Sequence, residues 1–547
     1  MCGRTADLPV AEEKQHGRGP EPEQIRGRPG QLEQRDAGRF PLRTNPRHVP
    51  ARAFTIPAVV TLLISSLVTT IPAFAKPAPK KKSLGASLER QFASQKKNVL
   101  QSIKFIRLQD GAVIYKFDPE KRVSPASVTK LVTAAVALGK FGPTYTFTTR
   151  IAHTGQRRAQ AISGDLIAIG DGDPLLISEK MWQVAADLRA MGIREISGDI
   201  VVDNSLFDAE TRDASREEGA NASSNAYDAP VSAFAVNFNT VAVTVSPGEK
   251  PGSPGVVRTD PVDLDGIKVE SSVKTGGPGS ETKLAAARIG SEGQTPLLRV
   301  SGTIAADSEP KKIYRSMVNP GRLAGDYLRA FLQDAGISTR GRVRTGKASG
   351  DERVLLTVPS YDMRRIVSGL NTFSNNFIGD MLTKRFAAGS ATPGSLERGA
   401  KVIRDYLKQE VGIRDGFVIE NGSGLSTENR LSADDIVRLL AHMEKDMTVF
   451  PDFLASLPSY GWDGSLKRRM KGSDRDLIGG LIRAKSGTLS EPITVSTLAG
   501  YLKHPDEGLI AFAILVNGVS GKSQPSVSEL RAQQDAALAA LLKTRQN

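Results

Sequence analysis

The stretch Ser124-Pro-Ala-Ser127-Val-Thr-Lys130-Leu-Val-Thr-Ala-Ala-Val-Ala-Leu-Gly139 carries the most information about the fold. Ser124 followed by proline is a helix-start signal and Gly139 is a stop signal, so we expect a helix over residues 125–139 that is capped by Ser124. The S-x-x-K spacing places Ser127 and Lys130 on one face of this helix, within reach of each other. Its apolar residues recur at helical spacing and predict one buried stripe, made of Val128, Leu131, Val132, Ala135 and Leu138.

Ser127 and Lys130 could together perform nucleophilic catalysis. A serine hydroxyl attacks poorly until a base takes its proton, and a desolvated lysine of lowered pKa can be that base. The N-terminus of a helix would also favour a developing oxyanion. The motif alone is weak, because a surface serine and lysine remain the alternative. Three other pairs share the spacing: Ser94 with Lys97, Ser271 with Lys274, and Ser308 with Lys311.

A second short motif, Ser374-Asn375-Asn376, stands at the start of a helix that we predict over residues 376–387. Taken alone, its serine fits an ordinary N-cap residue. Ser223-Ser224-Asn225 has the same pattern, but no predicted helix follows it. The second motif therefore indicates a functional site only in combination with the other two motifs.

The third motif, Lys485-Ser486-Gly487-Thr488, directly follows a strand predicted over residues 481–484. The ammonium and hydroxyl groups could bind a substrate carboxylate, and Gly487 would let the backbone approach closely. A strand-ending turn is the alternative. Lys274-Thr275-Gly276 also matches, but it runs into Gly277-Pro278-Gly279, which indicates a loop.

Around these motifs the texture of the chain changes twice. Residues 99–150 and 351–547 mix helices and strands, whereas residues 151–350 carry short strand-like runs separated by Gly, Pro, Asp and Ser. We therefore predict one α+β domain interrupted by a large β-rich insertion. Further expected elements are a hairpin at 103–115, helices at 362–370, 395–409, 432–443 and 526–543, and strands at 165–169, 199–203, 241–245, 299–304, 494–501 and 509–516.

The first 98 residues are expected to lie outside these domains. Residues 1–51 have a composition typical of disorder, or of an extension upstream of the true start, for which Val49 is one position. Residues 52–75 contain an apolar run too short for a membrane span, and Ala73-Phe74-Ala75 follows it as a cleavage site. This pattern predicts a secretory signal peptide, with an uncleaved anchor as the alternative. Residues 76–98 are expected to form a basic linker and a first helix.

Composition excludes several kinds of site. The chain has one cysteine, Cys2, which excludes an intramolecular disulfide and a four-cysteine zinc site. Its 5 histidines include no H-x-x-x-H pair, so a helical zinc-protease motif is absent. The formal net charge of +14 suggests an anionic partner, without choosing among nucleic acid, membrane and cell-wall polymer. No basic-aromatic stripe is visible, which disfavours nucleic acid.

The three motifs occur in the order S-x-x-K, S-x-N, K-[ST]-G, the signature set of β-lactamases and penicillin-binding proteins. Over residues 100–545 the chain resembles the low-molecular-mass class C penicillin-binding proteins, the D-alanyl-D-alanine carboxypeptidase/endopeptidase family of serine peptidases. The 247 positions from Ser127 to Ser374 are typical of this family and exceed the gap in class A β-lactamases. The resemblance also covers residues 163–167, 172–174, 197–207, 229–234, 421–426, 461–466 and 498–501.

The resemblance implies a transpeptidase-like domain, with a β-sheet flanked by helices, and acyl transfer without metal or cofactor. Ser127 is implied to attack the carbonyl between two D-alanines, with Lys130 as the base. Ser374 would relay a proton to the leaving D-alanine, and Asn376 would hold this network and the substrate amide.

The third motif is implied to hold the end of the substrate. Lys485 and the hydroxyls of Ser486 and Thr488 would bind the terminal carboxylate, with Gly487 between them. Backbone N–H groups of Ser127 and Thr488 would form the oxyanion hole.

The implied partners are peptidoglycan stem peptides, with β-lactam antibiotics as covalent inhibitors, in an exported, periplasmic protein that associates loosely with the membrane at most. Carboxypeptidase and endopeptidase activity both stay open. A catalytically inactive, peptidoglycan-binding scaffold and a β-lactamase are the alternatives. A scaffold would give no covalent penicillin adduct, and a β-lactamase would release the adduct rapidly.

Three positions depart from the family pattern. The family often has an arginine that grips a side-chain carboxylate of the substrate, where this chain has Thr427. A usual stretch containing Trp and Asp is replaced by Asn221-Ala-Ser-Ser-Asn-Ala-Tyr-Asp228. Ser486 stands where threonine is usual and keeps the hydroxyl. The first two departures affect the expected side-chain specificity and leave the acylation residues untouched.

Overall fold

The computed structural model describes residues 84–93, 98–216, 223–260, 263–264, 266–290, 295–389, 391–469 and 478–544. The predicted extension, signal peptide and basic linker lie outside the described residues, as does the pair Ser94 with Lys97. Within the described ranges, no helix has both the length and the apolar character needed to cross a membrane.

A five-stranded antiparallel sheet is formed by strands from both ends of the chain. Its order is β18-β19-β20-β1-β2, so β1 pairs with β20 from the far end of the sequence. The predicted hairpin is confirmed, and Gly111 in its turn has a φ of +73°. The strands are β1 (Val99–Arg107), β2 (Val113–Phe117), β18 (Ile482–Leu489), β19 (Val495–His504) and β20 (Gly508–Gly518).

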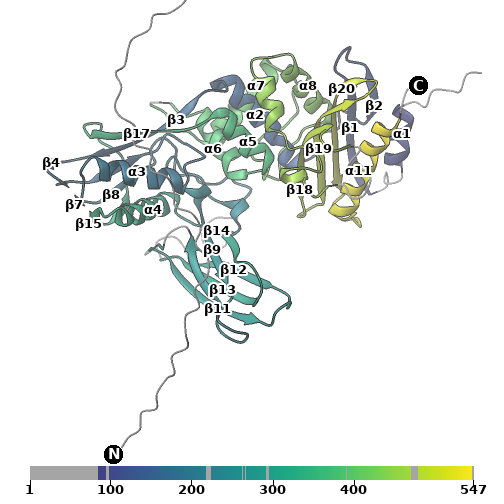
Figure 1. The fold of residues 1–547 in the computed structure, drawn as a ribbon. Helices are drawn as coiled ribbons and strands as arrows, with labels where there is room; N and C mark the ends of the chain where they lie inside the picture. The colour runs from purple at the N-terminus through teal and green to yellow at the C-terminus, as the bar shows by residue number, and fades with distance from the viewer. Residues whose placement is uncertain are drawn as a thin grey trace, which may run out of the picture. The chain divides into compact units, whose positions relative to one another are not determined.

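Both faces of this sheet are buried under helices. On β20, Ala511 and Ala513 belong to one hydrophobic core, whereas Phe512 and Ile514 belong to another. This alternation follows from the period of two in a strand. α1 (Leu84–Phe92) and α11 (Val527–Lys543) lie on the Phe512 side, as Figure 1 shows at the purple and yellow ends of the chain.

The other face of the sheet carries a group of helices. α8 packs directly on β1 and β20, and α2 lies at the centre of the group. Every residue of α2 from Thr129 to Leu138 is buried, so the prediction of a single buried stripe is wrong. The helices are α2 (Thr129–Phe141), α5 (Met363–Thr372), α6 (Asn376–Phe386), α7 (Leu396–Gln409), α8 (Ala433–Glu444) and α9 (Phe450–Ser456).

The middle of the chain forms four further sheets. Their orders are β16-β8-β6-β3-β17, β15-β7-β5-β4, β10-β9-β14 and β11-β13-β12. The strands are β3 (Thr146–His153), β4 (Arg157–Arg158), β5 (Ala161–Ile162), β6 (Leu166–Ile169), β7 (Glu195–Ile196), β8 (Ile200–Asp203), β9 (Thr240–Ser246), β10 (Val256–Asp260), β11 (Lys268–Gly276), β12 (Lys283–Ile289), β13 (Leu297–Ala305), β14 (Lys311–Ser316), β15 (Ser338–Thr339), β16 (Val343–Thr345) and β17 (Arg353–Asp362).

This middle segment is less purely β than its sequence texture predicts. It also contains α3 (Ser178–Ala190) and α4 (Pro320–Asp334), which pack against each other. A start signal for α4 was present, because Asn319 caps the helix and Pro320 follows it. The predicted α+β class is confirmed, with sheets flanked by helices. The division at 99–150, 151–350 and 351–547 stays a prediction.

The helix that follows the S-x-x-K serine differs from its predicted bounds. Residues 126–128 form a 3-10 turn, and α2 begins at Thr129 and ends at Phe141. Ala126 has a φ of +45°, in the left-handed region, which an α-helix cannot pass through. The predicted cap is wrong as well, because the Ser124 hydroxyl has no hydrogen-bond partner among the described residues.

Candidate active site

The backbone just before Ser127 is fastened to the central sheet. Thr497 on β19 donates a hydrogen bond of 2.8 Å to the carbonyl of Pro125. Asn517 on β20 pairs with both backbone groups of Ser124, at 2.8 Å and 3.0 Å. These side chains fix the backbone of Ser124 and Pro125 to β19 and β20, two residues before Ser127.

Lys130 is fully buried one turn further along. Its Nζ lies 3.0 Å from Ser127 Oγ and 2.6 Å from Asn376 Oδ1, and it also donates to the carbonyl of Ser423. Burial lowers the pKa of Lys130 to about 7, and the carboxylate of Asp380 opposes this lowering. A lysine with such a pKa is partly neutral at neutral pH and can accept the proton of a serine.

Ser374 stands in the short loop between α5 and α6. Its φ of +56° lies in the left-handed region, where a residue other than glycine is strained. Asn375, and not Ser374, caps α6, because its side chain accepts a 3.1 Å hydrogen bond from the N–H of Ile378. The Ser374 hydroxyl therefore caps no helix, and it accepts a 2.7 Å hydrogen bond from Lys485 Nζ instead.

Asn376 joins two walls of the site. Its Oδ1 accepts from Lys130, and its Nδ2 donates a 2.9 Å hydrogen bond to the carbonyl of Tyr227. Tyr227 belongs to the middle segment of the chain, so one amide side chain connects that segment to Lys130. Asn376 is therefore held at both ends.

The third motif lies inside β18 rather than after it, so the strand predicted over 481–484 is too short. β18 is the edge strand of the sheet next to the 3-10 turn that holds Ser127. Lys485 is fully buried, with its Nζ also 2.7 Å from the carbonyl of Ser486. Burial lowers the pKa of Lys485 well below its ordinary value, and the charge of Lys130 lowers it further.

The two hydroxyl groups of the third motif have different neighbours. Ser486 Oγ lies 3.3 Å from Ser465 Oγ, whereas Thr488 Oγ1 accepts a 3.0 Å hydrogen bond from Arg531 on α11. The sequence gives no hint of Arg531, because an exposed arginine near the start of a helix looks like a solvated residue. The structure adds a guanidinium next to the predicted carboxylate-binding residues.

The three motifs meet at one cleft of about 790 Å³. Ser127, Ser374, Asn376 and Thr488 border it, while Lys130 and Lys485 are buried behind these hydroxyl groups. Its other lining residues are Ser215, Arg216, Ser223, Tyr227, Asp228, Gly424, Leu425, Thr427, Leu489, Ser490 and Glu491. Among the competing motif matches in the described ranges, Ser223 borders the cleft, and the pairs on β11 and β14 do not line it.

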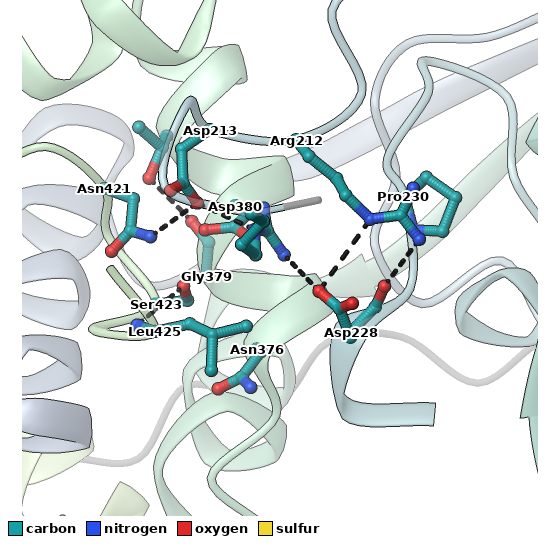
Figure 2. A network of polar contacts seen from close by, with 12 residues as sticks. Arg212, Asp213, Asp228, Pro230, Asn376, Gly379, Asp380, Asn421, Ser423 and Leu425 are labelled. Carbon is teal, nitrogen blue, oxygen red and sulfur yellow. Dashed lines mark hydrogen bonds and ion pairs between the residues drawn. The ribbon is translucent and has the colours of Figure 1, made fainter. Parts of the chain in front are cut away.

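A cluster of buried charges begins at the wall of this cleft, where Arg216 and Asp228 line it, and no sequence pattern indicated it (Figure 2). Arg216 forms ion pairs with Asp213 at 2.8 Å, with Asp228 at 3.4 Å and with Asp380 at 2.9 Å. Asn421 donates a 2.9 Å hydrogen bond to Asp213. The cluster ties Asp213, Arg216 and Asp228, from the middle segment, to Asp380 on α6.

The cleft also shows where the chain departs from the pattern of its suspected family. Thr427 borders the cleft in place of an arginine, and its hydroxyl lies 3.2 Å from Glu428 Oε1. Arg216, the arginine on the cleft wall, is already paired with three carboxylates. Asn221 of the second departure lies outside the described residues, whereas Tyr227 and Asp228 form part of the wall.

Comparison with known proteins agrees with the motifs. Residues 88–541 match the D-Ala-D-Ala carboxypeptidase 3 (S13) family. A D-alanyl-D-alanine carboxypeptidase of Actinomadura sp. (strain R39) is 31% identical over 440 residues, which cover 77% of this chain and 78% of the relative. The D-alanyl-D-alanine carboxypeptidase DacB of Haemophilus influenzae is 23% identical over 419 residues, covering 76% of this chain and 84% of that protein.

Solved structures show the same fold. The crystal structure of penicillin binding protein 4 (dacB) from Haemophilus influenzae superposes with a TM-score of 0.66 at 21% identity, covering 83% of this chain and 97% of that one. The same protein in complex with a β-lactam gives a TM-score of 0.64 at 20% identity, covering 82% and 97%. The chain belongs to the D-Ala-D-Ala carboxypeptidase 3 (S13) family, and it is a serine peptidase of the low-molecular-mass class C penicillin-binding proteins.

Proposed function

We propose that the protein is an exported, periplasmic DD-peptidase that cleaves peptidoglycan stem peptides through an acyl-enzyme on Ser127, as a carboxypeptidase, an endopeptidase or both. The observation that carries the proposal is the 3.0 Å contact between Ser127 Oγ and the buried Lys130 Nζ, at a cleft that the other two motifs also border. A serine beside a lysine of lowered pKa is an activated nucleophile.

In the first step, Lys130 takes the proton of the Ser127 hydroxyl while Oγ attacks the carbonyl between two D-alanine residues. The backbone N–H groups of Ser127 and Thr488 would receive the developing oxyanion. Asn376 keeps Lys130 in place by its 2.6 Å contact and is positioned to orient the substrate amide.

In the second step, the carbon–nitrogen bond breaks and the leaving amine takes a proton. We assign this relay to Ser374, and the assignment is supported by its hydroxyl contact with Lys485 and its position at the cleft. Water then attacks the acyl carbon, the bond to Ser127 Oγ breaks, and the serine recovers its proton. The products are a shortened peptide with a new carboxylate and a free amine.

The substrate's terminal carboxylate would lie at β18. Lys485 supplies a nearby cationic group, and the hydroxyls of Ser486 and Thr488 supply donors. Arg531 adds a guanidinium through its contact with Thr488. Charge-assisted hydrogen bonds of this kind are about twice as strong as neutral ones.

A β-lactam would acylate the same serine, since its strained amide presents a carbonyl to the nucleophile and a carboxylate to β18. The predicted signal peptide supports export, and the relatives' carboxypeptidase names support the substrate class.

The intact mass of the purified protein after incubation with benzylpenicillin tests this proposal. We expect one adduct per chain, which peptide mapping places on the peptide that carries Ser127, and release of D-alanine from a stem pentapeptide. A folded protein without an adduct would overturn the proposal in favour of a binding scaffold. Rapid release of hydrolysed penicillin would instead indicate a β-lactamase.

A further inference from the structure

Asp380 is a fully buried carboxylate that the proposed acyl transfer does not use. It lies on α6 four residues after Asn376, so the two side chains leave the same face of the helix. Asn376 contacts Lys130 directly, and Asp380 therefore lies one helical turn further from the base. A buried charge so close to a catalytic group acts on it with little screening by solvent.

The turn that contains Ser423 lies between Asp380 and Lys130. A Cβ atom on Gly379 would stand 2.9 Å from the Cα of Ser423, so α6 approaches this turn as closely as a backbone can. The Ser423 carbonyl accepts a hydrogen bond from Lys130 Nζ. The Ser423 hydroxyl lowers the pKa of the Asp380 carboxyl group. The two charged groups thus lie on two sides of one residue.

Arg216 holds Asp380 from the opposite side. Burial raises the pKa of the Asp380 carboxyl group, and the Arg216 guanidinium at 2.9 Å opposes this rise without reversing it. Burial would likewise lower the pKa of Arg216, but the surrounding aspartates hold it above its ordinary value. An ion pair of this kind favours the ionised form of the carboxylate over the protonated one.

The groups that face Lys130 come from each element packed against it. They are Ser127 from the 3-10 turn, Asn376 and Asp380 from α6, the Ser423 carbonyl, and Lys485 from β18. Lys485 disfavours a second positive charge, whereas Asp380 favours it. Among these groups, Asp380 is the anion that stabilises the protonated form of Lys130.

We propose that Asp380 is a positioning residue that sets the proton affinity of Lys130, and that its ion pair with Arg216 keeps it charged and in place. Through this pair, Arg216 on the cleft wall contributes to the environment of the proposed base. Asp380 does not touch the substrate, and it acts through Lys130 and Ser423. This inference rests on the proposed function, because it concerns Lys130 as a base.

The test is the pH dependence of acylation by benzylpenicillin, followed by intact mass, in the full-length protein. In the wild type we expect the rate to fall on the acidic side as Lys130 becomes protonated. Asp380→Asn removes the anion, so protonation of Lys130 becomes harder and the acidic limb should move to lower pH. A shift of about one unit is typical of one nearby charge.

A double variant provides a second, independent arm. The variant Asp380→Asn with Arg216→Gln removes a near anion and a more distant cation, and it leaves Asp213 and Asp228 without one of their ion-pair partners. Its limb should lie between those of the wild type and the Asp380→Asn protein. Asp380→Glu retains the charge. Its acidic limb should lie within about 0.3 pH units of that of the wild type, a small fraction of the shift expected for Asp380→Asn.

Asp434→Asn is the matched control. Asp434 lies on α8, away from the cleft lining, and forms ion pairs with Lys104 and Arg438. Its loss should lower thermal stability without moving the acidic limb. If Asp380→Asn lowers the rate at every pH but leaves the limb in place, Asp380 is merely structural and the inference is wrong.

Direct titration separates this inference from the proposed function. The pKa of Lys130 can be followed by NMR in protein labelled with 13Cε-lysine, with Lys130→Arg used for assignment. A lower Lys130 pKa in Asp380→Asn supports the inference even in a protein that penicillin does not acylate. An unchanged pKa overturns it even if wild-type acylation is normal.

Discussion

Gly487 on β18 packs directly against the backbone of Ser127. A Cβ atom at position 487 would stand 2.9 Å from the backbone N of Ser127, 2.8 Å from the carbonyl oxygen of Pro125 and 2.3 Å from Thr497 Oγ1. Real Cβ atoms do not approach other atoms so closely, so any side chain here must push β18 away from the nucleophile. The glycine of the third motif therefore fixes the distance between Ser127 and the edge strand.

Gly487→Ala should accordingly lower the rate of acylation by benzylpenicillin by about 100-fold, because an ångström of misplacement in an active site has effects of that size. The added methyl group should also destabilise the protein by about 1–3 kcal/mol, as overpacking usually does. Time courses of acylation by benzylpenicillin measure the effect on the rate, and thermal unfolding measures the effect on stability.

Gly277→Ala is the control for this change. An added Cβ at position 277 would meet no atom within 4 Å in the described structure. The substitution should alter neither rate nor stability by a measurable amount. Equal rates for Gly487→Ala and the wild type would show that the close approach has no part in forming the site.

Ser127→Ala should abolish penicillin labelling while the fold is kept. The Ser127 side chain caps no helix, since α2 begins at Thr129 and its N-cap, Val128, makes no side-chain hydrogen bond. We expect a stability change within about 1 kcal/mol, as for most substitutions outside a core. Circular dichroism and intact mass together check this, with Ser308→Ala, from a competing motif, as the control that keeps labelling. Residual labelling of the Ser127→Ala protein would mean that another residue is the nucleophile.

Local sequence patterns predicted those parts of the site whose geometry is local. The S-x-x-K spacing brings Ser127 and Lys130 together, and the helix after Asn376 starts where the sequence indicates. The predicted cap at Ser124 was wrong, because Ala126 has a left-handed φ and α2 begins only at Thr129, too far along the chain for the Ser124 hydroxyl to cap it.

The charge cluster shows why the rest could not be predicted. Arg216 and Asp380 are 164 positions apart, and no periodicity links them. One signal was present in the sequence: Asp380 is an acidic residue between Gly379 and Met381 on the apolar side of a predicted helix. A buried acid in such a place needs a partner, but the sequence cannot say which of the many arginines supplies it.

The stability of the protein should rise with pH between neutral and alkaline conditions, in part because of Lys130. The folded protein binds the Lys130 proton with a pKa of about 7, whereas the unfolded chain binds it with an ordinary value of 10.5. Between these values the unfolded state binds more protons, so raising the pH favours the folded state. Lys130→Met should flatten this dependence and abolish labelling.

Denaturant unfolding at pH 7, 8.5 and 10 measures the effect as the difference between wild type and Lys130→Met. Buried Lys485 titrates in both proteins, but its pKa is less depressed in the variant, which lacks the charge of Lys130, so the titration of Lys485 is measured separately in each protein. At pH 7 the free energy of unfolding should be higher for Lys130→Met than for the wild type. This difference should become smaller towards pH 10. A gap that does not vary with pH would mean that Lys130 keeps an ordinary pKa in the folded protein.

Arg531→Ala should weaken the binding of substrates that carry a free C-terminal carboxylate. The guanidinium contacts the Thr488 hydroxyl at the edge of the cleft, so we expect KM for a stem pentapeptide to rise about tenfold, equivalent to one charge-assisted hydrogen bond. A peptide with an amidated C-terminus should show no such change. Lys522→Ala, which removes another exposed cation, controls for long-range charge. Equal losses for both peptides would argue against a contact with the carboxylate.

Thr427→Arg should change which side chain the cleft accepts at the third residue of the stem peptide. Thr427 borders the cleft, and the arginine already there, Arg216, is paired with three aspartates and offers no charge to a substrate. A new guanidinium should lower KM about tenfold for peptides with a carboxylate on that side chain, the gain expected from one bidentate pair. Thr427→Gln adds similar length without charge and should leave the preference unchanged. The ratio of kcat/KM for peptides with and without the carboxylate is the measurement, and an unaltered ratio in Thr427→Arg would place position 427 outside the substrate's reach.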